Sequence, residues 1–108
     1  MKNKKKVILT DFRENFAKEL RKNSKNLDYF IKDSVEQYEK DGDFSIFLEN
    51  LRVAAMAVGM SKVSKKVKIT RDALYKSLSK EGNPSSRTLN ALLETIGIKI
   101  HYSYQSSK

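Results

Sequence analysis

The sequence predicts an all-α protein: a helix-turn-helix domain of about five helices that ends in a short C-terminal β-strand. Apolar residues recur at helical spacing through most of the chain after residue 26, and glycines stand where helices would end. The last apolar residues instead alternate with polar ones, which is a strand pattern. The 108 residues can bury a core of their own. We expect a basic N-terminal arm or helix over residues 1–25 and the helix-turn-helix domain over residues 26–108.

The N-terminal arm has a weak helical pattern. Phe12, Phe16 and Leu20 recur at helical spacing, but the polar residues 23–26 interrupt it. Two longer amphipathic helices then follow. Asn26 can cap the first, which the DGD sequence at 41–43 ends, and Gly59 can close the second. Their apolar positions are Leu27, Phe30, Ile31, Val35 and Tyr38, then Phe44, Phe47, Leu48, Leu51, Ala55 and Val58.

Two short helices come next. Ser61 can cap a helix that presents Val63 and Val67, and Thr70 can cap a second helix over residues 71–79. In the second helix Leu74 and Leu78, together with Ala73, are expected to face the core. Two short helices joined by a turn of about three residues form a helix-turn-helix.

The rest of the chain contains one more helix and the strand. A loop with Gly82, Asn83 and Pro84 precedes a helix that Ser85 caps and Gly97 closes. The predicted strand has an apolar face of Ile98, Ile100, Tyr102 and Tyr104. Because a lone strand is unstable, it must pair either with residues 7–9 or with the same strand of a second subunit. The second pairing would make a homodimer.

Charge is distributed in blocks within a formal net charge of +9. Residues 1–25 and 60–80 are strongly basic, whereas residues 26–50 are acidic. A basic block of this kind is the footprint of a polyanion binder, and the alternative is a lysine-rich face that only keeps the protein in solution.

Composition argues against an enzyme. The chain has no cysteine and a single histidine, His101, so thiol catalysis, disulfides and zinc sites are excluded. We expect no catalytic residues, no metal and no cofactor. No apolar run approaches the roughly 20 residues of a membrane span, and the apolar run at 7–9 is too short for an export signal. The sequence therefore predicts a cytoplasmic protein that does not enter a membrane.

The helix over residues 71–79 has the features of a recognition helix. Arg71 can read guanine O6 and N7, Tyr75 can touch a thymine methyl or a phosphate, and Lys76 can neutralise phosphate. Asp72 is more simply an acidic residue favoured in a first helical turn. Further contacts to the sugar–phosphate backbone are expected from both flanks. The predicted DNA-binding residues are Ser61, Lys62, Thr70, Arg71, Asp72, Tyr75, Lys76, Ser79, Lys80 and Asn83.

Residues 60–79 resemble the Cro/repressor-type helix-turn-helix. Ser64 takes the small position of the first helix and Thr70 the cap of the second, but Lys68 stands where that pattern usually has glycine. A wider resemblance, over about residues 27–100, is to HigA-like addiction-module antidote proteins. It is carried in order by DGD, FLENLRVA, GMSK, RDALYKSLS and EGNPS, followed by Leu89 and IGI at 96–98.

This resemblance implies a dimeric DNA-binding antitoxin that represses its own operon and neutralises a RelE-like ribonuclease toxin. In such a dimer two recognition helices would enter successive major grooves of a double-stranded DNA operator, about 34 Å apart. The acidic helix around Asp28, Asp33, Glu36 and Glu39 would face away from DNA and could dock a basic toxin. Two alternatives stay open: a stand-alone phage-type transcriptional regulator, and a protein-interaction module without DNA binding.

Overall fold

The computed structural model describes residues 4–79 and 82–106, with side chains from Phe12 onward in the first helix. This part of the chain is all-helical, as predicted. Five helices follow residue 23, and the N-terminal arm adds a sixth. They are α1 (Lys4–Lys22), α2 (Ser24–Asp41), α3 (Phe44–Val58), α4 (Met60–Val67), α5 (Arg71–Ser77) and α6 (Ser86–Ile96).

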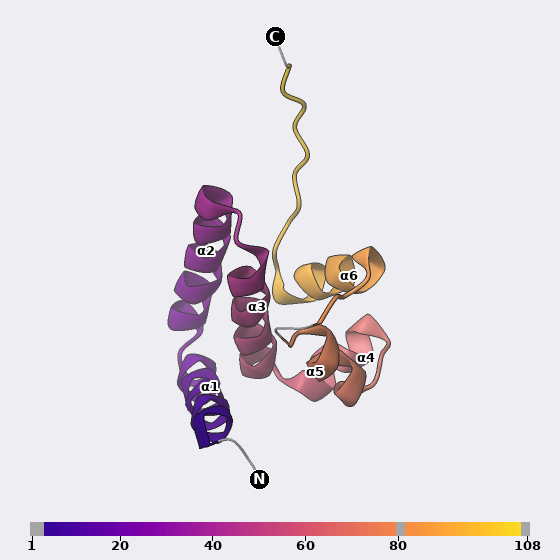
Figure 1. Cartoon of the computed structure of the whole chain (residues 1–108). Coiled ribbons are helices and arrows are strands. Elements are labelled where there is room, and N and C mark those ends of the chain that lie inside the picture. Colours follow the sequence, from indigo (N-terminus) through magenta and orange to yellow (C-terminus); the bar gives the residue numbers. More distant parts are fainter. Residues whose placement is uncertain (1–3, 80–81, 107–108) are drawn as a thin grey trace.

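Helix α3 is the centre of the molecule. In Figure 1 α1 and α2 lie on one side of α3, and α4, α5 and α6 lie on the other. α3 can serve both sides because apolar residues surround most of its axis. Its buried residues are Phe47, Leu48, Leu51, Val53, Ala54, Ala55, Met56 and Ala57.

Helix α1 shares this core. Ala17 and Leu20 are buried in the same cluster as the α3 residues. The Arg21 guanidinium donates to the carbonyl oxygens of Met56 (2.6 Å) and Ala57 (3.0 Å), near the end of α3. Cations are favoured there because the last carbonyls of a helix have no partner within it. The proposed division of the chain near residue 26 stays a prediction.

The cap between α1 and α2 is Asn23, so the prediction of Asn26 was wrong. The Asn23 side-chain oxygen accepts hydrogen bonds from the backbone N–H groups of Lys25 (3.0 Å) and Asn26 (3.4 Å). Asn26 therefore lies in the first turn of α2, and the break between the helices is a single residue. The caps Ser85, Gly42 and Gly97 lie where they were predicted.

The chain turns sharply between α3 and α4. Gly59 has φ +118° and is the N-cap of α4, so Ser61 lies inside the first turn and does not cap the helix. The two helix axes differ in direction by 107° at this glycine. Taken together, α3 and α4 have the length and apolar composition of a membrane span, but the chain bends between them. No single described helix is long and apolar enough to cross a membrane.

The predicted C-terminal strand is absent from the described residues. Residues 98–106 have no regular secondary structure and leave the helical body as an extended tail (Figure 1). Residues 7–9, the one candidate partner within the chain, lie in α1. A strand needs a neighbouring strand to satisfy its N–H and C=O groups, and no strand is found among residues 4–79 and 82–106.

The turn between α4 and α5 has the backbone shape that the glycine of similar motifs provides. Lys68 has φ +67° and ψ +42°, the left-handed region, and its N–H donates to the Ser64 carbonyl at 2.8 Å. It is the one non-glycine residue with positive φ among those described. In this region the Cβ of a lysine lies too close to the following carbonyl oxygen, so this backbone conformation lowers the stability of the fold.

Replacing Lys68 by glycine should therefore stabilise the fold. We expect Lys68→Gly to raise the free energy of unfolding in urea by up to about 1 kcal/mol, after allowing for the extra freedom of glycine in the unfolded chain. Lys66→Gly is the matched control, because it removes the same charge from an exposed position in the last turn of α4, where glycine should lower the free energy of unfolding by up to about 1 kcal/mol. Equal losses in both variants would contradict the assignment of strain to Lys68.

Candidate nucleic-acid interface

Helices α4 and α5 form a small unit that is held firmly from behind. Val63, Leu74 and Leu78 have no exposed surface, and they join α4 and α5 to the central core. Ser64 is buried in α4, and its hydroxyl donates to the Ser61 carbonyl at 3.0 Å. A larger side chain at this position would push α4 away from its neighbours.

The outer edge of α5 begins at a regular cap. The Thr70 hydroxyl oxygen accepts the Ala73 N–H at 3.0 Å, which fixes the start of the helix. Arg71, Asp72 and Lys76 are exposed on this edge. Ala73 is exposed as well, so its predicted place beside the leucines in the core was wrong; α5 is short, and the leucines alone fill its inner face.

The other predicted contact residues surround this edge with different exposures. Ser61 and Lys62 are exposed in the first turn of α4, and Asn83 is exposed in the loop after α5. Ser79 is half-buried, and its hydroxyl donates to the Lys76 carbonyl at 2.8 Å. Lys80 lies outside the described residues.

Tyr75 is half-buried, because its ring packs against the hydrophobic core and also lies beside Arg52 of α3. The Arg52 guanidinium carbon lies 5.4 Å from the centre of the Tyr75 ring, a cation–π contact. The Arg52 Nε is buried, with no hydrogen-bond partner among the described residues. Burial lowers the pKa of Arg52, and the nearby Arg13 lowers it further, although an arginine stays protonated. Arg52 thus fixes the ring orientation of Tyr75.

The sequence analysis missed Arg52 as a residue of this site. Its one sequence signal is a cation inside the otherwise apolar stretch of α3 from Leu51 to Val58. Nothing in the sequence connects it with Tyr75, which follows 23 positions later (75 − 52) on another helix.

The surface of α4, α5 and their turn is almost uniformly positive. The exposed cations are Lys62, Lys65, Lys66, Lys68, Arg71 and Lys76, and Asp72 is the one acidic residue in residues 60–79. Both ion pairs found among the described side chains, Arg13–Glu49 and Lys22–Glu19, lie elsewhere. Cations without carboxylate partners attract a polyanion such as a nucleic acid backbone.

Helix α2, which carries most of the acidic residues between positions 26 and 50, lies on the opposite side of α3 from α4 and α5 (Figure 1). Its acidic residues do not form one surface. Asp28, Glu36 and Glu39 border a groove between α2 and the end of α6, whereas Asp33 lies beside a hollow between α1 and α2. The fold thus separates the acidic helix from the basic edge of α4 and α5.

The loop after α5 packs tightly on that helix. The Gly82 N–H donates to the Ser79 carbonyl at 2.8 Å, and a Cβ on Gly82 would lie 2.2 Å from the Ser77 carbonyl oxygen and 2.5 Å from that of Lys76. These neighbours are backbone atoms at the end of α5, which cannot move without disturbing the helix.

Gly82→Ala should therefore lower the free energy of unfolding by about 1–3 kcal/mol, the usual cost of overpacking. Thermal unfolding followed by circular dichroism measures the effect as a fall in Tm. Asn83→Ala, at the exposed neighbouring position, should change stability by less than about 0.5 kcal/mol. Equal Tm values for the two variants would show that the close approach at residue 82 is unimportant.

Comparison with known proteins gives one family. A family model described as "Probable addiction module antidote protein" matches residues 13–104. The match begins inside α1, so it includes part of the N-terminal segment that the sequence resemblance left out. No curated protein and no solved structure matches the chain significantly.

Proposed function

Because the chain belongs to the probable addiction module antidote family, we propose that it is a HigA-like antitoxin that binds operator DNA through a Cro/repressor-type helix-turn-helix. In this proposal it represses its own operon and neutralises a RelE-like ribonuclease toxin. It acts by binding rather than by catalysis.

The observation that carries the DNA-binding proposal is the two-sided character of α5. Leu74 and Leu78 are fully buried, while Arg71 and Lys76 on the same short helix are exposed and lack a carboxylate partner among the described residues. A recognition helix needs this combination, because it must stay rigid while its outer edge enters the major groove.

Each side chain then has a role that follows from its chemistry. Arg71 lies in the first turn of α5, and in this proposal its planar fork binds guanine. Tyr75 contacts a thymine methyl or a phosphate, and Arg52 positions its ring. Lys62 and Ser61, in the first turn of α4, meet the sugar–phosphate backbone, where unpaired helix N–H groups favour anions.

A homodimer fits this mode of binding. Two copies related by a two-fold axis would place their α5 helices in successive major grooves, about 34 Å apart, on a palindromic operator. One short helix reads too few bases for a specific site, and a second copy doubles the number of bases read.

Loss of the Arg71 guanidinium should weaken binding to the operator upstream of the gene. We expect Arg71→Ala to raise the Kd by roughly 5- to 150-fold, which corresponds to about 1–3 kcal/mol, and to affect random DNA much less. Fluorescence anisotropy with labelled duplexes at several salt concentrations measures both. Lys40→Ala is the control, since Lys40 is an exposed cation on α2. An equal loss on operator and random DNA would assign Arg71 to phosphate contact alone.

The α1–α2 side of the molecule is free to hold the toxin while α4 and α5 hold DNA. Asp33 and the exposed Tyr29 both border the hollow between α1 and α2. We assign toxin docking to this surface, since an acidic residue beside an exposed ring suits a basic protein partner.

Asp33→Lys should weaken neutralisation of the toxin encoded beside this gene, whereas Arg71→Ala should leave it intact. Growth of cells that co-express toxin and antitoxin measures neutralisation, and co-purification measures the complex. Normal growth with Asp33→Lys would remove the docking surface from the proposal. A wild-type chain that binds its operator but neutralises no neighbouring gene product would instead be a stand-alone, phage-type regulator.

A further inference from the structure

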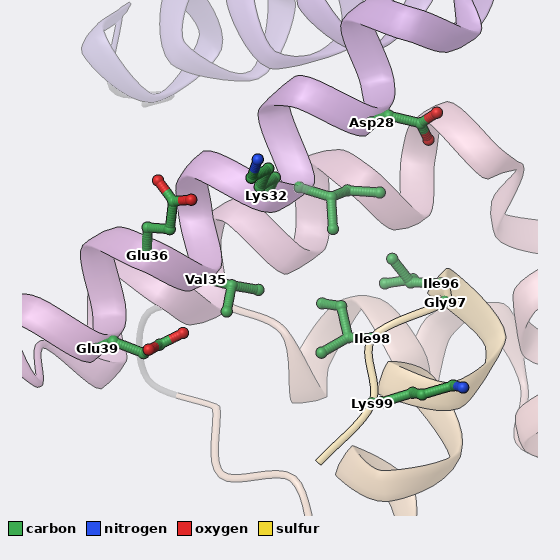
Figure 2. Close-up of a pocket in the computed structure, with 10 residues that line it drawn as sticks. Asp28, Lys32, Val35, Glu36, Glu39, Ile96, Gly97, Ile98 and Lys99 are labelled. Carbon is green, nitrogen blue, oxygen red and sulfur yellow. The ribbon is translucent and has the colours of Figure 1, made fainter. Parts of the chain in front are cut away.

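An apolar groove lies at the point where the C-terminal tail leaves the helical body. Ile31 and Val35 of α2 line one side, and Ile96 and Ile98 line the other. Figure 2 shows Val35 facing Ile98 across the groove, with Asp28, Glu36 and Glu39 carried by α2. The groove is open to solvent and has a volume of about 410 Å³.

The tail that starts at this groove carries large side chains in solvent. The exposed fraction is 43% for Ile100, 90% for Tyr102 and 92% for Tyr104. These three residues alternate with polar ones and continue the face that begins with Ile98. An exposed apolar row of this kind marks an interaction surface.

We propose that the tails of two copies pair as an antiparallel two-stranded ribbon, so that the tyrosines of one copy cover the α2–α6 groove of the other. This inference rests on the homodimer in the proposed function and supplies its interface. It also gives the tail the β-pairing that its sequence pattern predicts and that the described residues of one chain do not form.

The pattern of the tail limits the register. Directly opposite residues of an antiparallel pair point to the same face, so the apolar rows coincide only in alternate registers. In the register centred on His101, Ile98 stands opposite Tyr104 of the second copy, and Ile100 stands opposite its Tyr102. Because Ile98 is also part of the groove wall, this register brings the second copy's Tyr104 to the groove.

Charge favours the tail as the occupant. Residues 98–108 contain Lys99 and Lys108 and no acidic residue, whereas the groove is bordered by three carboxylates, Asp28, Glu36 and Glu39, and by two cations, Lys32 and Lys99. A tail without acidic side chains meets no like charge from these carboxylates.

The tyrosines supply most of the area that a specific dimer needs. Four tyrosines would bury roughly 600–1,000 Å² at about 150–250 Å² each. A specific interface needs about 1,000 Å² or more, and the two Ile100 side chains with the groove walls add to the tyrosines.

Sedimentation equilibrium of the full chain, without DNA or toxin, tests the proposal. We expect the wild type to be a dimer and Tyr102→Ser/Tyr104→Ser to raise the dimer dissociation constant at least ten-fold. Tyr29→Ser is the matched control, because Tyr29 is an aromatic residue 70% exposed on α2 outside the groove, and this variant should stay dimeric. Circular dichroism checks that all three proteins have the same helix content.

A cysteine placed at the centre of the ribbon tests the register. The natural chain has no cysteine, and directly opposite residues of an antiparallel pair have Cα atoms about 4.5–5.5 Å apart, within the range of a disulfide. His101→Cys should therefore form a covalent dimer under mild oxidation, whereas Ser45→Cys, an exposed position on α3, should not.

An unchanged dimer in the double tyrosine variant would overturn the proposal, and so would the absence of a covalent dimer with His101→Cys. Tail variants that stay dimeric but lose toxin binding would make the toxin the occupant of the groove, which also overturns it. If the wild type is monomeric but binds operator and toxin, the proposal of tail pairing is wrong and the antitoxin proposal is unaffected. A dimer that pairs through its tails but binds neither operator nor toxin would support the tail pairing and overturn the antitoxin proposal.

Discussion

Burial of α3 on two sides is the interaction on which the rest of the structure depends. Eight of its fifteen residues are buried, and both layers of helices rest on them. α1 and α2 pack against one side and α4 and α6 against the other, while α5 is attached through α4 and its leucines. Loss of this helix would remove most of the packing that joins the acidic and the basic parts of the molecule. The proposed DNA-binding edge is therefore rigid because the core behind it is rigid.

The same arrangement separates two kinds of partner. The basic edge of α4 and α5 and the acidic helix α2 lie on opposite sides of α3 (Figure 1). A polyanion and a protein partner could then be held together without competing for one surface. Arg52 also links the central helix α3 to the proposed DNA-binding edge, because its guanidinium lies over the ring of Tyr75 in α5. A substitution inside the core could thus alter DNA recognition without touching DNA.

The structure keeps the turn of the motif at the position where the sequence departs from the usual residue. Lys68 departs from the usual glycine, yet its backbone still takes the left-handed turn. The match from residue 13 onward agrees with the packing of Ala17 and Leu20 in the core, since a helix that completes the core is part of the unit that evolves together. The packing of the N-terminal arm was hard to predict because its apolar residues are sparse. Its partners in α3 also lie about 36 positions further along the chain, as Glu49 does from Arg13.

Although Val53, Ala54, Met56 and Ala57 of α3 are buried beyond the predicted stripe and Ala73 of α5 is exposed, the sequence by itself determined the helical class, the leucines on the inner faces of α3 and α5, and most of the helix ends. These features depend on contacts within about four residues, such as the Ser85 cap and the i, i+4 pair Leu74 and Leu78. Only the tertiary structure decided which cap starts α2, that α1 joins the core, that Arg52 holds Tyr75 and that a groove opens beside the tail. Those features depend on residues brought together from distant parts of the chain, and no local pattern records such contacts. The alternation in the tail is the clearest case: the pattern is local, but a strand forms only when a second strand lies beside it.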